Sequence, residues 1–319
     1  MSNETLEARI TAVGADGSVS ADEVMFLRRT IFADGVVSTK ELDALFALAE
    51  RAPNGDPEWP QYFAEAVADF YLREEEPHGY LTPAEFETLK DRVMKDGGAS
   101  TLKNGLLVKL METATQTTPE MAEFVGEQIK QSIIKKDGGA VVDKKDTMLL
   151  RRYLFAMGGC GAVAVTRKEA ELLFDINDAV GKADNDPAWS DLFVIGIVNH
   201  LMAHLGYEPP SREEAFRRHA WVSDHSVNVG GFFKRMFSGG VGAVRDAYTQ
   251  ESVTEERNKE RAQGAAFAEQ ISQDEADWLA ARIGRDGVFD NNERQLIDRM
   301  RELEADLPKT LKELVSRAA

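Results

Sequence analysis

The phrase ADGSVSADE at residues 15–23 recurs eighteen residues later as ADGVVSTKE at 33–41. Each copy contains a Ser with a Glu three positions further on, which is the pattern of an N-terminal capping box. Each copy also carries a Gly shortly before that box, and Gly commonly ends a preceding helix because it tolerates a positive φ. The phrase therefore predicts a helix that stops abruptly and a second helix that starts directly after it.

Capping boxes of this kind occur along most of the chain. The pairs are Ser20 with Glu23, Ser38 with Glu41, Thr82 with Glu85, Thr166 with Glu169 and Asp290 with Glu293. Apolar residues follow at spacings of three and four, as in Leu42, Leu45 and Phe46, which is the period of one helix face. Runs typical of strands are scarce. The sequence therefore predicts an all-α protein.

Two longer phrases indicate an internal duplication. LRRTIFA at 27–33 returns as LRRYLFA at 150–156, and DPEWPQYF at 56–63 returns as DPAWSDLF at 186–193. The two pairs stand in the same order at similar spacing, and self-similarity of this kind is typical of repeated structural units. We therefore expect two related helical units in tandem.

A third, partial copy closes the chain. ISQDE at 271–275 and FDNNE at 289–293 are eighteen residues apart, as are VSADE and VSTKE in the first unit. Gly clusters and then a polar, helix-favouring stretch precede this copy. The predicted organisation is a first unit at 1–126, a second unit at 127–222, a Gly-rich to helical linker at 223–265 and a partial third unit at 266–319.

Composition and charge argue against several classes of function. The chain has 319 residues, 43% of them hydrophobic, and a net charge of −17. This charge argues against nucleic acid as a partner, because such binding needs basic patches. The single cysteine, Cys160, cannot form a disulfide within the chain, and MSNETLEARITAV at the N-terminus lacks the features of a secretion signal. A cytoplasmic protein is expected.

Contact with a membrane is expected to be peripheral at most. The sequence contains no run of about eighteen apolar residues, so no membrane span is predicted. Residues 230–237, which include FFKRMF, are a candidate for an amphipathic anchor. An apolar cluster of this kind more often packs against its own domain. A protein partner is expected instead.

Paired D-G-x-hydrophobic-S-x-x-E hinges, one short helix apart, resemble the tellurite-resistance TerB family and its wider TerB-like superfamily. The likeness is clearest at 10–50 and 280–300. It implies tandem TerB-like helical bundles, binding of a divalent cation of the calcium kind, protein interaction and a role in stress-response assemblies near the membrane. By position, the implied ligands are Asp16, Glu23, Asp34 and Glu41 in the first unit and Asp286, Asp290 and Glu293 in the last. The second unit departs from the pattern and is expected to lack the ion.

The same carboxylates also fit a structure without metal. An EF-hand calcium loop needs oxygens at its first, third and fifth positions, where the hinge at 30–41 offers Thr30, Phe32 and Asp34. A shared ion therefore requires that carboxylates of neighbouring hinges converge. If each Glu instead accepts from its own N-cap amide, the protein is a metal-free scaffold or adaptor.

No catalytic signature is recognisable in the sequence, so a non-enzymatic protein is expected. The nearest candidate is the pair His200 and His204, whose spacing places both on one helix face and can hold zinc. The HExxH pattern of metalloproteases is absent because Leu201 follows His200. A metal-dependent enzyme built on the two histidines is the second alternative.

Overall fold

The computed structural model describes residues 10, 12–31, 37–73, 78–95, 97–98, 100–156, 165–201, 273–285, 289–302 and 308–317. These ranges are predominantly helical. The helices are α2 (Ala21–Ile31), α3 (Thr39–Arg51), α4 (Glu58–Arg73), α5 (Pro83–Met94), α6 (Thr101–Thr113), α7 (Pro119–Ile134), α8 (Lys144–Leu154), α9 (Arg167–Val180), α10 (Pro187–Leu201), α15 (Gln273–Arg282), α16 (Asn291–Glu302) and α17 (Lys309–Arg317). Two short strands, β1 (Ser18–Val19) and β2 (Asn54–Gly55), pair in parallel. The all-α prediction is confirmed at this level.

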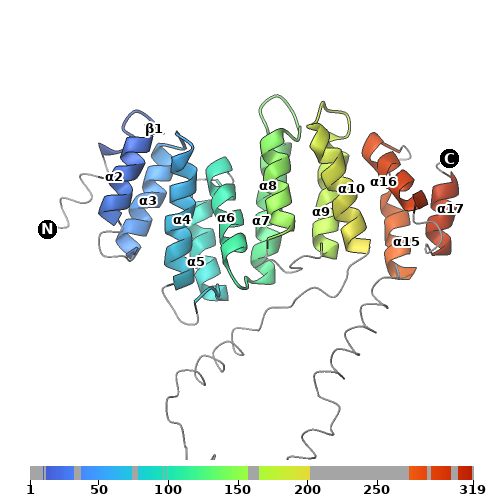
Figure 1. The fold of residues 1–319 in the computed structure, drawn as a ribbon, viewed down its shortest axis with the longest axis horizontal. Helices are drawn as coiled ribbons and strands as arrows, with labels where there is room; N and C mark the ends of the chain where they lie inside the picture. The colour runs from blue at the N-terminus through green and yellow to red at the C-terminus, as the bar shows by residue number, and fades with distance from the viewer. Residues whose placement is uncertain are drawn as a thin grey trace, which may run out of the picture.

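The helices form two rows that follow the order of the chain (Figure 1). In one row, α2, α4, α6, α8, α10 and α16 each pack against the next. In the other row, Arg92 of α5 donates to Asp43 of α3. The ring of Phe86 in α5 meets Phe124 of α7 edge-on, and α7 packs against α9. Each of these helices contacts the helix two places along, so the described part of the molecule is an elongated array.

All five predicted capping boxes are confirmed, and three of them begin α3, α5 and α9. Ser38, Thr82 and Thr166 each accept from the amide of a Glu three residues further on. That Glu accepts in turn from the amide of the capping residue. These bonds satisfy amides that the first turn of a helix leaves without a partner. Local sequence therefore determines where these helices begin.

The duplicated D-P-x-W phrases occupy equivalent positions in the fold. The amide of Asp56 donates to the Val19 carbonyl at 2.9 Å, and the amide of Asp186 donates to the Val142 carbonyl at 2.8 Å. The tryptophan three residues after each Asp is completely buried, and its amide donates to the carbonyl of that Asp. The repeat in the sequence is therefore also a repeat of hydrogen bonds.

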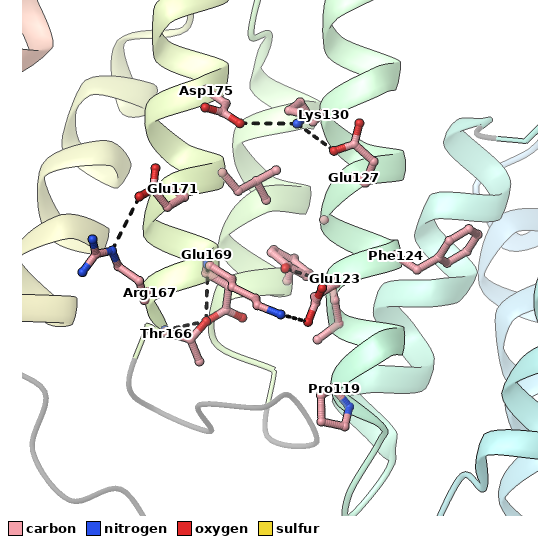
Figure 2. A pocket seen from close by; sticks show the side chains of 15 residues that line it. Pro119, Glu123, Phe124, Glu127, Lys130, Thr166, Arg167, Glu169, Glu171 and Asp175 are labelled. Atoms are coloured by element: carbon pink, nitrogen blue, oxygen red, sulfur yellow. Dashed lines mark hydrogen bonds and ion pairs between the residues drawn. The ribbon is translucent and has the colours of Figure 1, made fainter. Parts of the chain in front are cut away.

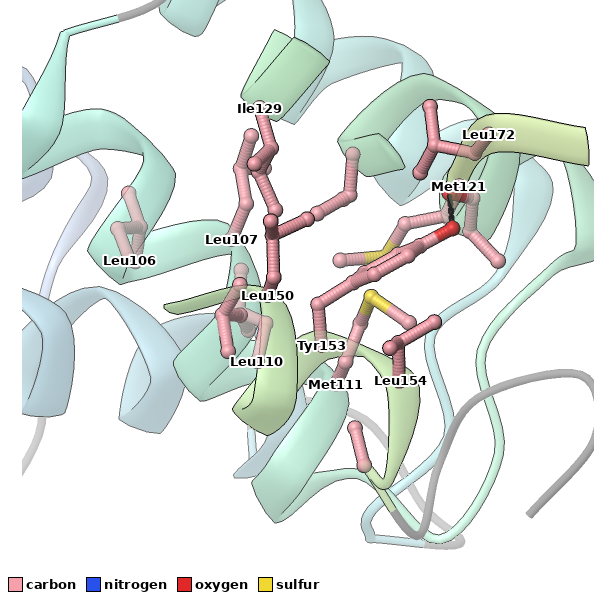
Figure 3. Close-up of a cluster of buried hydrophobic side chains, with 14 of the residues drawn as sticks. Leu106, Leu107, Leu110, Met111, Met121, Ile129, Leu150, Tyr153, Leu154 and Leu172 are labelled. Atoms are coloured by element: carbon pink, nitrogen blue, oxygen red, sulfur yellow. Dashed lines mark hydrogen bonds between the residues drawn. The ribbon is translucent and has the colours of Figure 1, made fainter. Parts of the chain in front are cut away.

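One hydrophobic core runs through the array. Its buried side chains form a single cluster that extends from the hinge before α2 to α17. Figure 3 shows the section in which side chains of α6, α7, α8 and α9 gather around Tyr153. The predicted boundary between residues 126 and 127 falls inside α7. Helices assigned to the first and second units therefore share one core.

Two expectations fall outside the described residues. They concern the linker at 223–265 and the candidate membrane contact at 230–237. Among the helices that the structure describes, none is long and apolar enough to cross a membrane.

Gly126 of α7 lies where three helices approach one another closely. A Cβ atom at this position would lie 2.6 Å from Tyr153 Oη and 2.9 Å from Leu172 Cδ2. The Tyr153 hydroxyl donates to the Ala122 carbonyl at 3.0 Å, which holds the ring in place. Gly105 of α6 is a matched control, because a Cβ atom there meets nothing within 4 Å.

Gly126→Ala is expected to lower the free energy of unfolding by about 1–3 kcal/mol, the usual cost of overpacking. Gly105→Ala should raise it by up to about 1 kcal/mol, because Ala favours a helix over Gly. Urea denaturation of both variants and the parent protein measures the two changes. Equal stabilisation by the two substitutions would contradict the close approach at Gly126.

Candidate functional site

A groove of about 740 Å³ lies between α7 and α9 (Figure 2). Its apolar lining comes from Ala122, Gly126, Tyr153 and Leu172, and charged side chains of both helices surround it. A hollow of this kind suits the apolar face of another protein segment, whose side chains can enter between two helices. The groove is therefore a candidate interaction site.

Ion pairs cross the groove at two levels. Lys168 of α9 pairs with Glu123 of α7. Two turns further along α7, Lys130 pairs with Glu127 at 2.7 Å and with Asp175 of α9 at 3.4 Å. The carboxylates of these pairs are exposed, and pairs in contact with solvent contribute about 1 kcal/mol or less each. A bound segment can therefore displace them at little cost.

Glu169 lies at the start of α9 and lines the groove. Its carboxylate accepts from the amide and from the hydroxyl of Thr166, both at 2.8 Å, and only 4% of the residue is exposed. Burial raises the pKa of Glu169 above the ordinary value of 4.5, although the Thr166 hydrogen bonds act in the opposite direction. Glu169 is therefore a helix-capping residue whose carboxylate is largely shielded from solvent.

The first predicted metal hinge is a capping structure. Glu23 accepts from the amide of Gly14 at 3.0 Å and from the amide of Ser20 at 2.9 Å, one on each carboxylate oxygen. The Ser20 amide is the main cause of the lowered pKa of Glu23, and burial acts against it. Asp16 is exposed and accepts from the amide of Ser18 at 3.0 Å. Both carboxylates therefore serve the loop that carries them.

The second hinge lies at the opposite end of α2. Glu41 accepts from the amide and the hydroxyl of Ser38 at 2.8 and 2.7 Å. Between Glu23 and Glu41 the chain passes along α2, which spans about 16 Å at 1.5 Å per residue. α3 then runs back, and Ala52 at its end lies against Gly14. Since a calcium–oxygen bond is about 2.3–2.6 Å long, the structure does not bring these two carboxylates together.

The last hinge repeats the geometry of the first. Glu293 accepts from the amide of Gly284 at 2.9 Å and from the amide of Asp290 at 3.1 Å, again one on each oxygen. Gly14 and Gly284 have φ angles of 65° and 66°. Asp290 accepts from the amide of Glu293 at 2.8 Å and from the side-chain amide of Asn177 at 2.6 Å. Burial is the main cause of the raised pKa of Glu293.

The predicted ligands are spread over separate hinges. Within the described ranges, no three His, Cys, Asp or Glu side chains are arranged to hold a metal ion. Asp34 and Asp286 lie outside the described residues. In the second unit, the Lys136 ammonium contacts Asp143 and Asp146 at the start of α8. Calcium binding by the seven carboxylates stays a prediction.

His200 of α10 is buried, with 7% of the residue exposed. Its Nδ1 lies 2.9 Å from the Val165 carbonyl oxygen, and its ring meets Trp278 of α15 edge-on at 5.3 Å. Burial lowers the pKa of the imidazole. His204 lies outside the described residues, so the pair expected to hold zinc is not placed. The contacts of His200 are those of a core residue.

Sequence reasoning missed the charged face of α9. Glu171, Asp175 and Asp178 follow one another at spacings of four and three, and Arg282 of α15 lies among them. This spacing indicates one helix face and is visible in the sequence. The arginine on α15 that contacts this face cannot be recognised from the sequence, because residues 202–272 separate α15 from α10.

Comparisons with known proteins give no family assignment. No protein-family model, curated protein or solved structure matches the chain. The candidate function therefore rests on the residues and the geometry described above.

Glu23 and Glu169 predict opposite dependences of stability on pH. The pKa of Glu23 is lowered, so its contribution to stability is present above about pH 4.5 and is lost as the pH falls through the folded-state pKa. The pKa of Glu169 is raised, so the folded state binds the proton more tightly than the unfolded state does. Its contribution to stability is therefore lost as the pH rises from 4.5 through the folded-state pKa.

The cost of Glu23→Gln in free energy of unfolding should grow from about pH 3 to about pH 7, whereas the cost of Glu169→Gln should shrink. Urea denaturation at a series of pH values measures both trends. Changes of the same sign in the two variants would show that the environments assigned to these carboxylates are wrong.

Proposed function

We propose that the protein is a non-enzymatic scaffold of TerB-like type whose hinges are held by helix caps without a bound ion. The observation that carries the proposal is the set of donors around the hinge carboxylates. Both oxygens of Glu23 and both oxygens of Glu293 accept a hydrogen bond from a backbone amide of their own hinge. A cation at the same oxygens would have to compete with these caps.

Helix capping alone accounts for the repeated phrase. An N-cap interaction contributes about 1 kcal/mol, and each hinge has to start a helix within a few residues of the previous one. Gly17, which stands six residues before Glu23 in the repeated phrase, has a positive φ of 85°, which residues with a Cβ atom disfavour. These two requirements explain a Gly and a Glu at constant spacing, and neither requirement involves a metal.

Calcium binding, which the resemblance implies, is the second candidate, and one observation favours it. Asp178 of α9 lines the same hollow of about 700 Å³ as Asp290 and Glu293. Burial raises the pKa of Asp178, and the charge of Asp290 adds to this effect. Crowded carboxylates favour a cation. However, Lys182 and Arg285 line the same hollow and already supply positive charge.

The scaffold is proposed to act by binding a protein partner. The rows of helices present long surfaces, and the groove between α7 and α9 offers an apolar lining to a bound segment. The net charge of −17 favours a basic partner. A cytoplasmic location and a role in a stress response are inferred from the sequence and from the TerB-like resemblance.

An enzyme that uses His200 and His204 is the less favoured alternative. A catalytic zinc site keeps an open position for water or substrate. His200 instead lies buried against Trp278, with Nδ1 next to a backbone carbonyl. These surroundings suit packing better than catalysis.

Thermal unfolding with calcium and with a chelator tests the proposal. A ligand that binds only the native state raises Tm according to its concentration and Kd. For the parent protein, we expect the same Tm in excess calcium and in EDTA. Glu293→Gln should lower Tm equally in both solutions, because it weakens a cap. A rise of Tm with calcium that Glu293→Gln removes would overturn the proposal in favour of the calcium site.

A further inference from the structure

The C-terminal helices dock onto the second unit through a buried charge. Arg282 of α15 is only 8% exposed. Its Nη2 lies 2.8 Å from Asp175 Oδ1 and its Nε lies 3.2 Å from Glu171 Oε2, with Asp178 at 3.9 Å. All three carboxylates belong to α9. We call this set, Glu171, Asp175 and Asp178, the acidic face of α9.

An aromatic contact accompanies the arginine. Trp278, one turn before Arg282, donates its indole N–H to Glu171. The Arg167 guanidinium lies 4.0 Å from the centroid of the Trp278 ring, and Phe174 meets the same ring edge-on at 5.8 Å. α9 therefore holds a Trp and an Arg that are four residues apart on the docked helix.

α16 adds a polar network to the same interface. Asn177 of α9 donates to Asp290 at 2.6 Å, and Asn292 of α16 donates to Asn177 at 2.7 Å. Ser190 of α10 donates to Asn292 at 2.5 Å. Both asparagines are buried. An interface that contains buried amides and a buried arginine is more polar than a domain core and resembles the interfaces of separable partners.

The first unit has an equivalent interface with less polar character. There α6 packs on α4, and Arg92 of α5 donates to Asp43 of α3 at 3.1 Å. Aligned on the capping boxes that begin α3 and α9, Asp43 corresponds to Glu171. In the same alignment, Ala49 stands where the second unit has Asn177. α15 and α16 thus take the place that α5 and α6 take in the first unit, with charged and amide contacts added to the apolar ones.

We propose that α15, α16 and α17 dock interchangeably on their own chain or on a second copy, so that Arg282 of one copy completes the acidic face of α9 in another. Exchange of an identical element preserves the contacts and therefore costs little. Residues 202–272 connect α10 to α15, whereas only residues 74–82 connect α4 to α5. A longer connection lowers the effective concentration of the attached helix, so a second copy can compete for the same site.

Two complementary variants separate docking within a chain from docking between chains. Arg282→Glu removes the arginine and keeps the acidic face. Glu171→Arg combined with Asp175→Asn removes the two carboxylates nearest to Arg282 and keeps the arginine. Neither variant alone retains the two close pairs that Arg282 makes with Glu171 and Asp175. A mixture combines the intact acidic face of the first variant with the intact α15 of the second.

The full-length variants are mixed in equal amounts, and mass is measured by size-exclusion chromatography with light scattering. The share of two-chain species in the mixture should exceed that in either variant alone by at least about tenfold, because each variant alone sets like charges against each other at the position where Arg282 is buried. If both variants are folded by far-UV circular dichroism and the mixture keeps the mass of one chain, the proposal is overturned.

An experiment with wild-type chains tests the proposal even if one of the variants fails to fold. Two wild-type copies that carry different affinity tags are expressed together and purified through one tag at a time. If α15, α16 and α17 exchange between copies, purification through either tag should also recover the copy that carries the other tag. Recovery of each tag without the other overturns the proposal.

Discussion

The hinge between consecutive helices is the constraint on which the rest of the structure depends. In the first and last hinges, one Glu accepts from a Gly amide nine residues earlier and also from the amide of its own N-cap residue. These two hydrogen bonds tie the end of one helix to the start of the next. The carboxylate therefore sets both the shape of the turn and the direction in which the next helix leaves.

Hinges of fixed shape give the array its regular order. Because the chain turns back at each hinge, a helix meets the helix two places along and the buried side chains form one continuous cluster. Neighbouring units are therefore coupled through a common core, as the contacts around Tyr153 illustrate (Figure 3). The contact between α9 and α15 differs, because a buried arginine and three partly exposed carboxylates add ion pairs to the apolar contacts there.

The sequence was most informative where structure depends on residues a few positions apart. The boxes at Ser38 and Thr166 and the repeated D-P-x-W phrase follow from local hydrogen bonds. Whether Glu23 and Glu41 converge depends instead on the direction of α2 and α3, which places their hinges at opposite ends of a helix. The docking of Arg282 on α9 joins two helices that lie on either side of residues 202–272 in the chain. No local pattern encodes such a contact. The groove between α7 and α9 likewise depends on how two helices approach at Gly126.

Amide hydrogen exchange at Gly14 and Gly284, measured by NMR in the presence of a chelator, tests most directly whether the hinge carboxylates act as caps. An amide that donates a stable hydrogen bond exchanges slowly, so capped hinges predict protection at both glycines without calcium. Glu23→Ala should remove the protection at Gly14 and leave that at Gly284 unchanged. Exchange at the rate of a free amide at both glycines of the parent protein would contradict capping as the role of these carboxylates.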